Sequence, residues 1–298
     1  MTGIERFRPD PIPAIHPLPE YLATGQRLEW YLDTQRVLQV PWMGVITMAY
    51  AHYPTFFGEL WRGLRPLCES RPFVEASQDL RKFVEEQTAK LEPRSLIAPL
   101  TEIGYAPREI DNIREMNTVF SHGNQPYVLI AAIVRHLLEV GDMAGGNETG
   151  GNEAALFEGR HAPDYDVPFL LMEAHHADDP TRAVYKDVEA VLNLPFVNTD
   201  YRAFARWPSY FALAWADLRE IAGKPEHEAI CQACHDQVAE LAAEILPNPG
   251  NLSADALRQA AAEDANLEEV IEVCRLFQWL LPGLITNVAY FRHQLDAV

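Results

Sequence analysis

The sequence predicts an all-α protein made of two tandem helical repeats that form a pseudo-twofold intramolecular dimer. Apolar residues recur at helical spacing along most of the chain, and the alternating pattern of β-strands is scarce. The chain also aligns with itself over long stretches, as a duplicated sequence does. We expect a first repeat with an N-terminal arm over 1–140, a linker or loop over 141–180 and a second repeat over 181–298.

Two segments carry the helical periodicity most clearly. Over 55–68 and over 230–245, apolar residues fall at i, i+3 and i+4 positions, which predicts an amphipathic helix in each place. Between the repeats, residues 141–163 are rich in Gly, Asn and Glu, which is typical of a linker or a mobile surface loop. No Lys-Ser/Thr pair follows these glycines, so they do not form a phosphate-binding motif.

The internal repeat is clearest where residues 31–67 align without a gap with residues 185–221, at a shift of 154 positions. Twelve of these 37 aligned positions are identical. A second block, 110–138, aligns with 267–295 at a shift of 157. We expect the two halves to pack against each other as the subunits of a twofold dimer do.

Composition excludes several classes of partner. The chain has 298 residues, of which 48% are hydrophobic, and a formal net charge of −19, with 24 basic against 43 acidic side chains. Nucleic acid is not an expected partner, because phosphate binding needs clustered Lys and Arg. No apolar segment has the length of a signal peptide core or of a membrane span, which favours a cytoplasmic location without membrane attachment. Four cysteines in such a long chain do not indicate a disulfide framework.

The two copies disagree at two informative positions. Ile46 in the first copy aligns with Asp200 in the second, and Asn124 in the first aligns with Leu281 in the second. If the apolar members are buried, the polar members point inward too, and a buried carboxylate needs a compensating role. A pseudo-twofold axis would bring Asp200 and Asn124 together in one pocket, with Ile46 and Leu281 meeting at the related place.

Local structure offers a simpler explanation of the same residues. Asn198, Thr199 or Asp200 is well suited to be the N-cap of the helix that follows Pro195. Likewise, Gly123 or Asn124 fits the left-handed residue that ends a helix. The residues alone leave capping and chemistry both open.

Three motifs are distinctive: Val-Pro-Trp at 40–42 followed by Pro54, Phe-Ser-His-Gly-Asn at 120–124 followed by Tyr127, and Thr-Asp-Tyr-Arg-Ala-Phe-Ala-Arg-Trp-Pro at 199–208. Together they resemble those of one family, the group I or DL-2-haloacid dehalogenases. The similarity covers roughly residues 30–295 and includes the duplication. It implies an all-helical pseudo-dimer that hydrolyses 2-haloalkanoic acids without a covalent ester, and it implies a homodimer.

The resemblance also implies roles for individual residues. Asp200 stands at the position of the water-activating base, and Asn124 at the position of the residue that holds the water. Trp42, Tyr127 and Thr199 fall at pocket positions, and Val45 takes the place of another pocket aromatic. The Asn-Pro step of the family is absent here, because Gln125 separates Asn124 from Pro126, which puts the size range of the substrate in doubt.

Such a site suits hydrolytic dehalogenation of short 2-haloalkanoic acids of either configuration. An Asp-activated water attacks C2 opposite the halide and inverts it, while an amide side chain orients the water. Helix N–H groups near Thr199 are suited to the substrate carboxylate. Trp42 and Tyr127 would exclude bulk water. The expected partner is a small halogenated carboxylic acid, and no metal or organic cofactor is required.

Two other signals support a different hypothesis. Cys231-Gln-Ala-Cys234-His235 matches a short haem-attachment pattern, and two cysteines at i, i+3 also suit thiol redox chemistry. His175 and His176 suggest a metal site, but we interpret them as part of a solvated loop. The alternative function is therefore a CxxC thiol-redox protein or a non-catalytic helical repeat protein in which Asp200 caps a helix.

Overall fold

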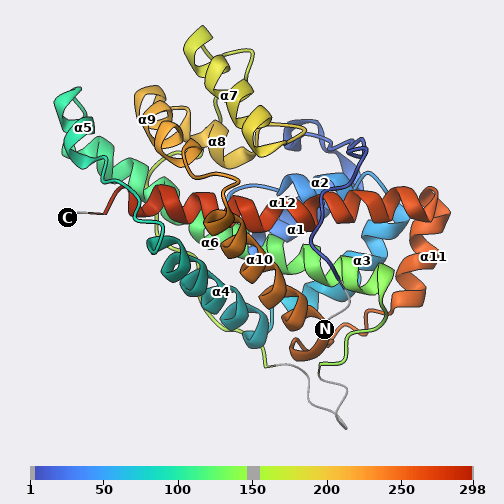
Figure 1. The fold of residues 1–298 in the computed structure, drawn as a ribbon. Coiled ribbons are helices and arrows are strands. Elements are labelled where there is room, and N and C mark those ends of the chain that lie inside the picture. The colour runs from blue at the N-terminus through green and yellow to red at the C-terminus, as the bar shows by residue number, and fades with distance from the viewer. Residues whose placement is uncertain (1–3, 146–154, 297–298) are drawn as a thin grey trace. The chain divides into compact units, whose positions relative to one another are not determined.

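The computed structural model describes residues 4–145 and 155–296, and in these ranges the chain forms helices and no β-strand (Figure 1). The all-α prediction is confirmed. In chain order, the elements are η1 (Glu20–Leu22), α1 (Gly25–Leu38), α2 (Val45–Tyr50), α3 (Pro54–Cys68), α4 (Arg71–Ala89), α5 (Ile97–Glu102), α6 (Pro107–Glu139), α7 (Asp179–Leu192), α8 (Thr199–Phe204), α9 (Pro208–Arg219), α10 (Pro225–Glu240), η2 (Leu241–Ile245), α11 (Ala254–Asp264) and α12 (Leu267–His293).

The chain divides into two compact units, each assembled from three separate stretches. Unit 1 consists of Met1–Leu80, Gly123–Ala162 and Ala233–Pro282. Unit 2 consists of Arg81–His122, Pro163–Gln232 and Gly283–Val298. Both units therefore draw on both halves of the sequence, and helices α4, α6, α10 and α12 have residues in each. The repeat boundaries at 140 and 181 concern sequence similarity rather than compactness, and they stay a prediction.

The predicted helices over 55–68 and 230–245 are present, with one difference. The first is α3, which begins with Pro54 at a position where a missing N–H costs nothing. The second is α10, whose apolar stripe is buried through Val238. Ile245 is predicted on the same stripe but is 56% exposed. The chain continues after α10 as the π-helical turn η2, in which hydrogen bonds join residues i and i+5, so the side chains beyond α10 no longer follow the α-helical spacing. The predicted loop over 141–163 includes 146–154, which lie outside the described residues.

Helix α1 of unit 1 and helix α7 of unit 2 are each held to a neighbouring helix by the same kind of contact. In unit 1, Asp33 of α1 accepts hydrogen bonds from Trp61 Nε1 and Arg65 Nε of α3, both at 2.9 Å. In unit 2, Asp187 of α7 accepts from Trp215 Nε1 of α9 at 2.7 Å and from Arg219 Nε at 2.6 Å. Each of these residues lies 154 positions from its counterpart.

The ends of these helices also recur. Gln39 follows α1 with a φ of 52°, and Asn193 follows α7 with a φ of 53°, so both helices end in a left-handed residue. The amide of Gln39 donates to Gln35 O and that of Asn193 to Glu189 O. Asn193 suits this position, because Asn adopts a positive φ more often than most other residues do.

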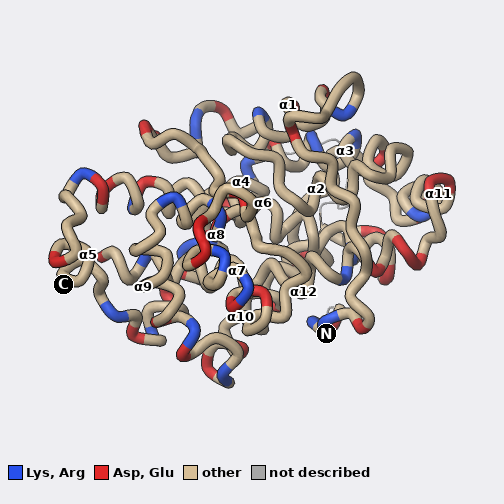
Figure 2. Tube along the Cα trace, turned by 90° about the horizontal axis from the view of Figure 1, so that it is seen from above, with Lys and Arg blue, Asp and Glu red and all other residues tan. Residues whose placement is uncertain are grey.

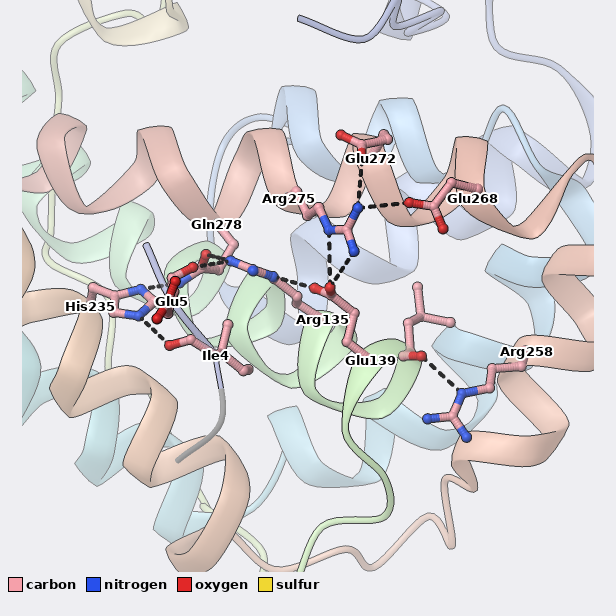
Figure 3. A network of polar contacts seen from close by, with 11 residues as sticks. Ile4, Glu5, Arg135, Glu139, His235, Arg258, Glu268, Glu272, Arg275 and Gln278 are labelled. Carbon is pink, nitrogen blue, oxygen red and sulfur yellow. Dashed lines mark hydrogen bonds and ion pairs between the residues drawn. The ribbon is translucent and has the colours of Figure 1, made fainter. Parts of the chain in front are cut away.

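Unit 1 contains a buried polar network that ties the N-terminal arm to three helices (Figure 3). Arg135 of α6 is 2% exposed, and it donates to the carbonyl oxygen of Glu5, to Gln278 of α12 and to Glu139. Arg275 of α12 donates to Glu139 Oε1 through Nε at 2.9 Å and Nη2 at 2.6 Å. The buried guanidinium is therefore compensated by a carboxylate and by neutral acceptors, as a charge in this position requires.

Acidic and basic residues are spread along the tube of the chain rather than gathered in one basic stripe (Figure 2). Residues of both signs occur along the chain, whose formal net charge is −19. Among the described helices, none is both long enough and apolar enough to cross a bilayer.

Candidate active site

In unit 1, the predicted pocket aromatics Trp42 and Tyr127 lie against each other. Their ring centroids are 6.2 Å apart, and the side chains are 3% and 2% exposed. The Tyr127 hydroxyl accepts a hydrogen bond from Gly44 N and donates one to Trp42 O, each at 2.9 Å. Tyr127 of α6 thereby fixes the segment that leads into α2. Burial raises the pKa of Tyr127, so it stays protonated and acts as a wall and a clamp rather than as a base.

Two glycines make this packing possible. A Cβ on Gly123 would lie 2.4 Å from the Trp42 ring, and a Cβ on Gly44 would lie 2.8 Å from the Tyr127 ring. Any side chain at either position would push the aromatic rings away. Gly123 is therefore a packing residue in the interior of α6, where it lets Trp42 approach the helix backbone.

Asn124 is also inside α6, one residue beyond Gly123 and three before Tyr127 on the same face of the helix. It is 4% exposed. The alternative that Gly123 or Asn124 ends a helix is wrong, because α6 continues to Glu139 even though Pro126 is inside it. Val45 is the first residue of α2 and is partly exposed.

In unit 2, Asp200 is the second residue of the short helix α8 and is 2% exposed. The N-cap is Asn198, so Asp200 is not the cap. The side chain of Asn198 makes no capping hydrogen bond, and its Oδ1 is buried without a hydrogen-bond partner among the described residues. Thr199 is 6% exposed. This helix start is thus built from buried polar side chains, which an ordinary surface cap would not require.

An ion pair and a backbone hydrogen bond hold α8 from one side. Arg202 Nη1 contacts both carboxylate oxygens of Glu173, at 2.7 and 2.9 Å. Arg202 Nη2 also donates to Thr199 Oγ1 at 3.4 Å, and the amide of Met172 donates to the carbonyl of Arg202 at 2.9 Å. The segment before α7 therefore locks the helix that carries Asp200.

A chain of buried polar groups holds α8 from inside unit 2. Asn287 of α12 donates through Nδ2 to the Tyr201 hydroxyl at 2.9 Å, and Asn287 Oδ1 lies 2.8 Å from His227 Nε2. Burial raises the pKa of Tyr201, and the Asp200 carboxylate raises it further against the opposing hydrogen bond from Asn287. Tyr201 is therefore a neutral anchor beside Asp200.

The two apolar residues that align with Asp200 and Asn124 in the internal repeat are both buried. Ile46 is 2% exposed and Leu281 is 5% exposed, both in unit 1. Asn124 belongs to unit 1 and Asp200 to unit 2, and their convergence stays a prediction. The structure thus groups Trp42, Tyr127 and the Gly123–Asn124 step in one unit, and Thr199 with Asp200 in the other.

No protein-family model matches the chain. Individual relatives do. An (R)-2-haloacid dehalogenase of Rhizobium sp. (strain NHG3) is 42% identical over 259 residues, which cover 86% of this chain and 97% of the relative. The chain belongs to the 2-haloacid dehalogenase family. An (R)-2-haloacid dehalogenase of Pseudomonas putida is 36% identical over 290 residues, covering 94% of this chain and 92% of the relative.

Solved structures agree with this assignment. A D-2-haloacid dehalogenase mutant in complex with D-2-chloropropionate matches with a TM-score of 0.87 and 34% identity, over 95% of this chain and 97% of that one. A complex of D-2-haloacid dehalogenase with L-lactate matches equally well. The chain is therefore a hydrolase that removes halogen from 2-haloacids, as predicted, and the non-catalytic alternative is wrong.

The structure also describes the surroundings of the cysteine motif and of the histidine pair. Cys231 and Cys234 are both buried and form no disulfide with each other. Cys231 faces His227 and Thr286, and His235 contacts the carbonyl oxygen of Ile4. His175 and His176 are exposed in the turn before α7, as interpreted from the sequence.

Sequence reasoning missed the contacts that position the site. The Tyr127 bridge to Gly44, the Arg202–Glu173 ion pair and the Asn287 link to Tyr201 join residues far apart in the chain. A periodic pattern reports which face of a helix is apolar, and it carries no information on such distant pairings.

Proposed function

We propose that this enzyme hydrolyses short (R)-2-haloalkanoic acids to (S)-2-hydroxy acids, by direct attack of a water molecule that Asp200 activates. The observation that carries the proposal is the burial of Asp200, which is 2% exposed on α8, where the equivalent position of α2 holds Ile46. Burying a carboxylate costs several kcal/mol unless it is paired or hydrogen-bonded, and functional sites are where proteins most often bury one. A carboxylate kept from bulk water is well suited to remove a proton from a bound water.

Asn124 supplies the second function that direct attack needs. Its amide orients the water, so that one lone pair faces C2 while Asp200 takes the proton. Trp42 and Tyr127 form the apolar wall. Val45 follows Trp42 closely in sequence at the start of α2, and Thr199 is at the start of α8. N–H groups in the first turn of α8 suit the substrate carboxylate, because a helix N-terminus favours anions.

The relatives favour one configuration. Both curated relatives above are named (R)-2-haloacid dehalogenases, and both structures are of D-2-haloacid dehalogenase. Our sequence-based prediction of activity on both enantiomers is therefore narrowed to the (R) form. A D-configured chloro acid and L-lactate are related by inversion at C2, which supports single displacement over a double one.

The proposal includes an internal duplication, of which one copy kept a scaffold role. Its support is the recurrence at 154 positions of the Asp33 and Asp187 contacts and of the helix ends at Gln39 and Asn193. Helices α2 and α8, six residues each, begin at positions that are also 154 apart. A homodimer and a cytoplasmic location remain predictions.

Chloride release from the separate enantiomers of 2-chloropropionate tests the proposed function. We expect the (R) form to yield chloride and (S)-lactate, and the (S) form to react much more slowly. Equal rates on both forms would return the enzyme to the DL group. Lactate of retained configuration would contradict direct attack by water.

A further inference from the structure

A cluster of three different ligand types lies at the start of α10 in unit 2. His227 Nδ1 is 3.8 Å from Cys231 Sγ and 3.8 Å from Glu228 Oε1. The three ligand atoms all lie within 4.8 Å of one another. His227 and Cys231 are four residues apart, so the helix itself places them on one face.

The neighbours of His227 determine which of its ring nitrogens could bind a metal ion. Asn287 Nδ2 donates to the Tyr201 hydroxyl, so Asn287 Oδ1 is the acceptor that faces His227 Nε2 at 2.8 Å. Nε2 therefore carries the proton, and the lone pair is on Nδ1, which faces Cys231 and accepts a long hydrogen bond of 3.4 Å from Gly223 N. A histidine held through its far nitrogen by an oxygen acceptor is the usual arrangement of a metal ligand.

The burial of the three side chains supports the same interpretation. His227 is 2% exposed and Cys231 is fully buried, whereas the Glu228 side chain is 48% exposed and leaves one side of the cluster open to solvent. An ion can therefore reach the cluster from the side of Glu228, while the other two ligands are held inside the protein.

We propose that His227, Glu228 and Cys231 form a binding site for a divalent transition-metal ion such as Zn²⁺, separate from the dehalogenation site. A thiolate, an imidazole and a carboxylate suit Zn²⁺, whereas Mg²⁺ and Ca²⁺ prefer oxygen ligands alone. Two ligands of one tetrahedral zinc ion are roughly 3.3–3.7 Å apart. The two distances of 3.8 Å are therefore close to the required geometry, and a rotation of the half-exposed Glu228 side chain would close the rest.

Binding would replace protons with the metal ion. The Cys231 thiol loses its proton to solvent, the Gly223 hydrogen bond to Nδ1 is given up, and the thiolate and carboxylate charges balance the two positive charges of the ion. The hydrogen bond that the Cys231 thiol donates to Thr286 Oγ1, at 3.8 Å, is lost with that proton. A water molecule completes four ligands.

Cobalt(II) titration of the reduced, metal-free enzyme tests the site. We expect one equivalent to bind and to produce a thiolate-to-cobalt charge-transfer band in the near ultraviolet, which Zn²⁺ abolishes by displacement. Cys231→Ser should remove the band, and Glu228→Gln should weaken binding at least tenfold. Cys234→Ser and Glu226→Gln, on the same helix, are the matched controls and should leave both readouts unchanged.

Glu228→Gln alters an exposed side chain, so it keeps the test valid if Cys231→Ser is poorly folded. A titration without a charge-transfer band would overturn the proposal. So would a band that survives in folded Cys231→Ser, or unchanged affinity in Glu228→Gln.

Discussion

Helices α2 and α8 are the same length and occupy equivalent places in the sequence, yet their second residues differ in kind. In α2, Ile46 is 2% exposed and apolar; in α8, Asp200 is 2% exposed and acidic. Neither helix has a side-chain hydrogen bond at its N-cap, which is Gly44 for α2 and Asn198 for α8. The backbone of the two helices is therefore alike, and the side chains decide what each one does.

The two helices are also anchored differently. The entry into α2 is fixed by the Tyr127 hydroxyl, which bridges Gly44 N and Trp42 O. In α8, the Tyr201 hydroxyl receives a hydrogen bond from Asn287, and Arg202 pairs with Glu173. The comparison teaches that the helix with the buried carboxylate is held by an ion pair and an amide hydrogen bond, whereas the entry to the helix with the buried isoleucine is held by a tyrosine hydroxyl.

Removing the carboxylate charge of Asp200 on α8 should have the largest effect on activity. Asp200→Asn keeps the shape but removes the base, so we expect chloride release to fall at least about 100-fold. The matched control is Ile46→Val on α2, which should cost roughly 0.5–1.5 kcal/mol of stability and leave the rate within a few-fold. Steady-state rates and thermal melts of both variants provide the measurement. A folded Asp200→Asn enzyme with more than about a tenth of the wild-type rate would refute the role of Asp200.

Some features of the fold and of the candidate site could be predicted from the sequence, and others could not. Helical periodicity located α3 and α10, because burial of one helix face imposes that pattern. The swap of Ile46 for Asp200 singled out a residue that is indeed buried. The alternative of a helix end at Gly123 or Asn124 is wrong, because in α6 Gly123 makes room for Trp42, a packing requirement that no local pattern reveals. The Asn287 link to Tyr201 left no signal in the sequence either.

Truncating the predicted water-orienting residue should have the next largest effect. We expect Asn124→Ala to slow chloride release by roughly tenfold or more, because the water loses its orientation. Combined with Asp200→Asn, it should add little, since residues that act on one water are not additive. The measurement is a double-mutant cycle on the rate of chloride release. Fully multiplicative losses would mean that the two residues act independently.

Removing the Tyr127 hydroxyl should loosen α2 rather than change the chemistry of α8. Tyr127→Phe leaves Gly44 N and Trp42 O without their buried partner, so we expect a loss of about 1–3 kcal/mol in the free energy of unfolding. Urea denaturation measures it. Tyr185→Phe, which removes one part-buried bond to Met172 O, is the comparison in unit 2 and should cost less. An equal or smaller loss in Tyr127→Phe would show that the clamp is unimportant.

The smallest effects are expected on stability, from replacing Asp33 in unit 1 and Asp187 in unit 2, and the two should be equal. Hydrogen bonds from Arg36 and Trp61 outweigh burial and lower the pKa of Asp33, and those from Arg219 and Trp215 lower the pKa of Asp187. A lowered carboxyl pKa stabilises the fold above the unfolded pKa, near 4, and the benefit is lost as the pH falls through the folded value. Because both sites are partly exposed, Asp33→Asn and Asp187→Asn should each cost about 1 kcal/mol or less at neutral pH.

Melts at neutral pH and at a pH below the folded pKa values measure this pair. The deficit of each variant should shrink in acid. A deficit that grows in acid, or that appears in one unit only, would contradict the equivalence of the two contacts.

The most direct test of the account is a single turnover of (R)-2-chloropropionate in ¹⁸O-water with enzyme in excess. If Asp200 activates a water that attacks C2 directly, the label enters the lactate in the first turnover and none enters the protein. Mass spectrometry of the lactate and of the peptide that contains Asp200 measures both. Label in the Asp200 carboxylate, with unlabelled lactate from the first turnover, would show that Asp200 is a nucleophile forming an ester, and would contradict the mechanism proposed here.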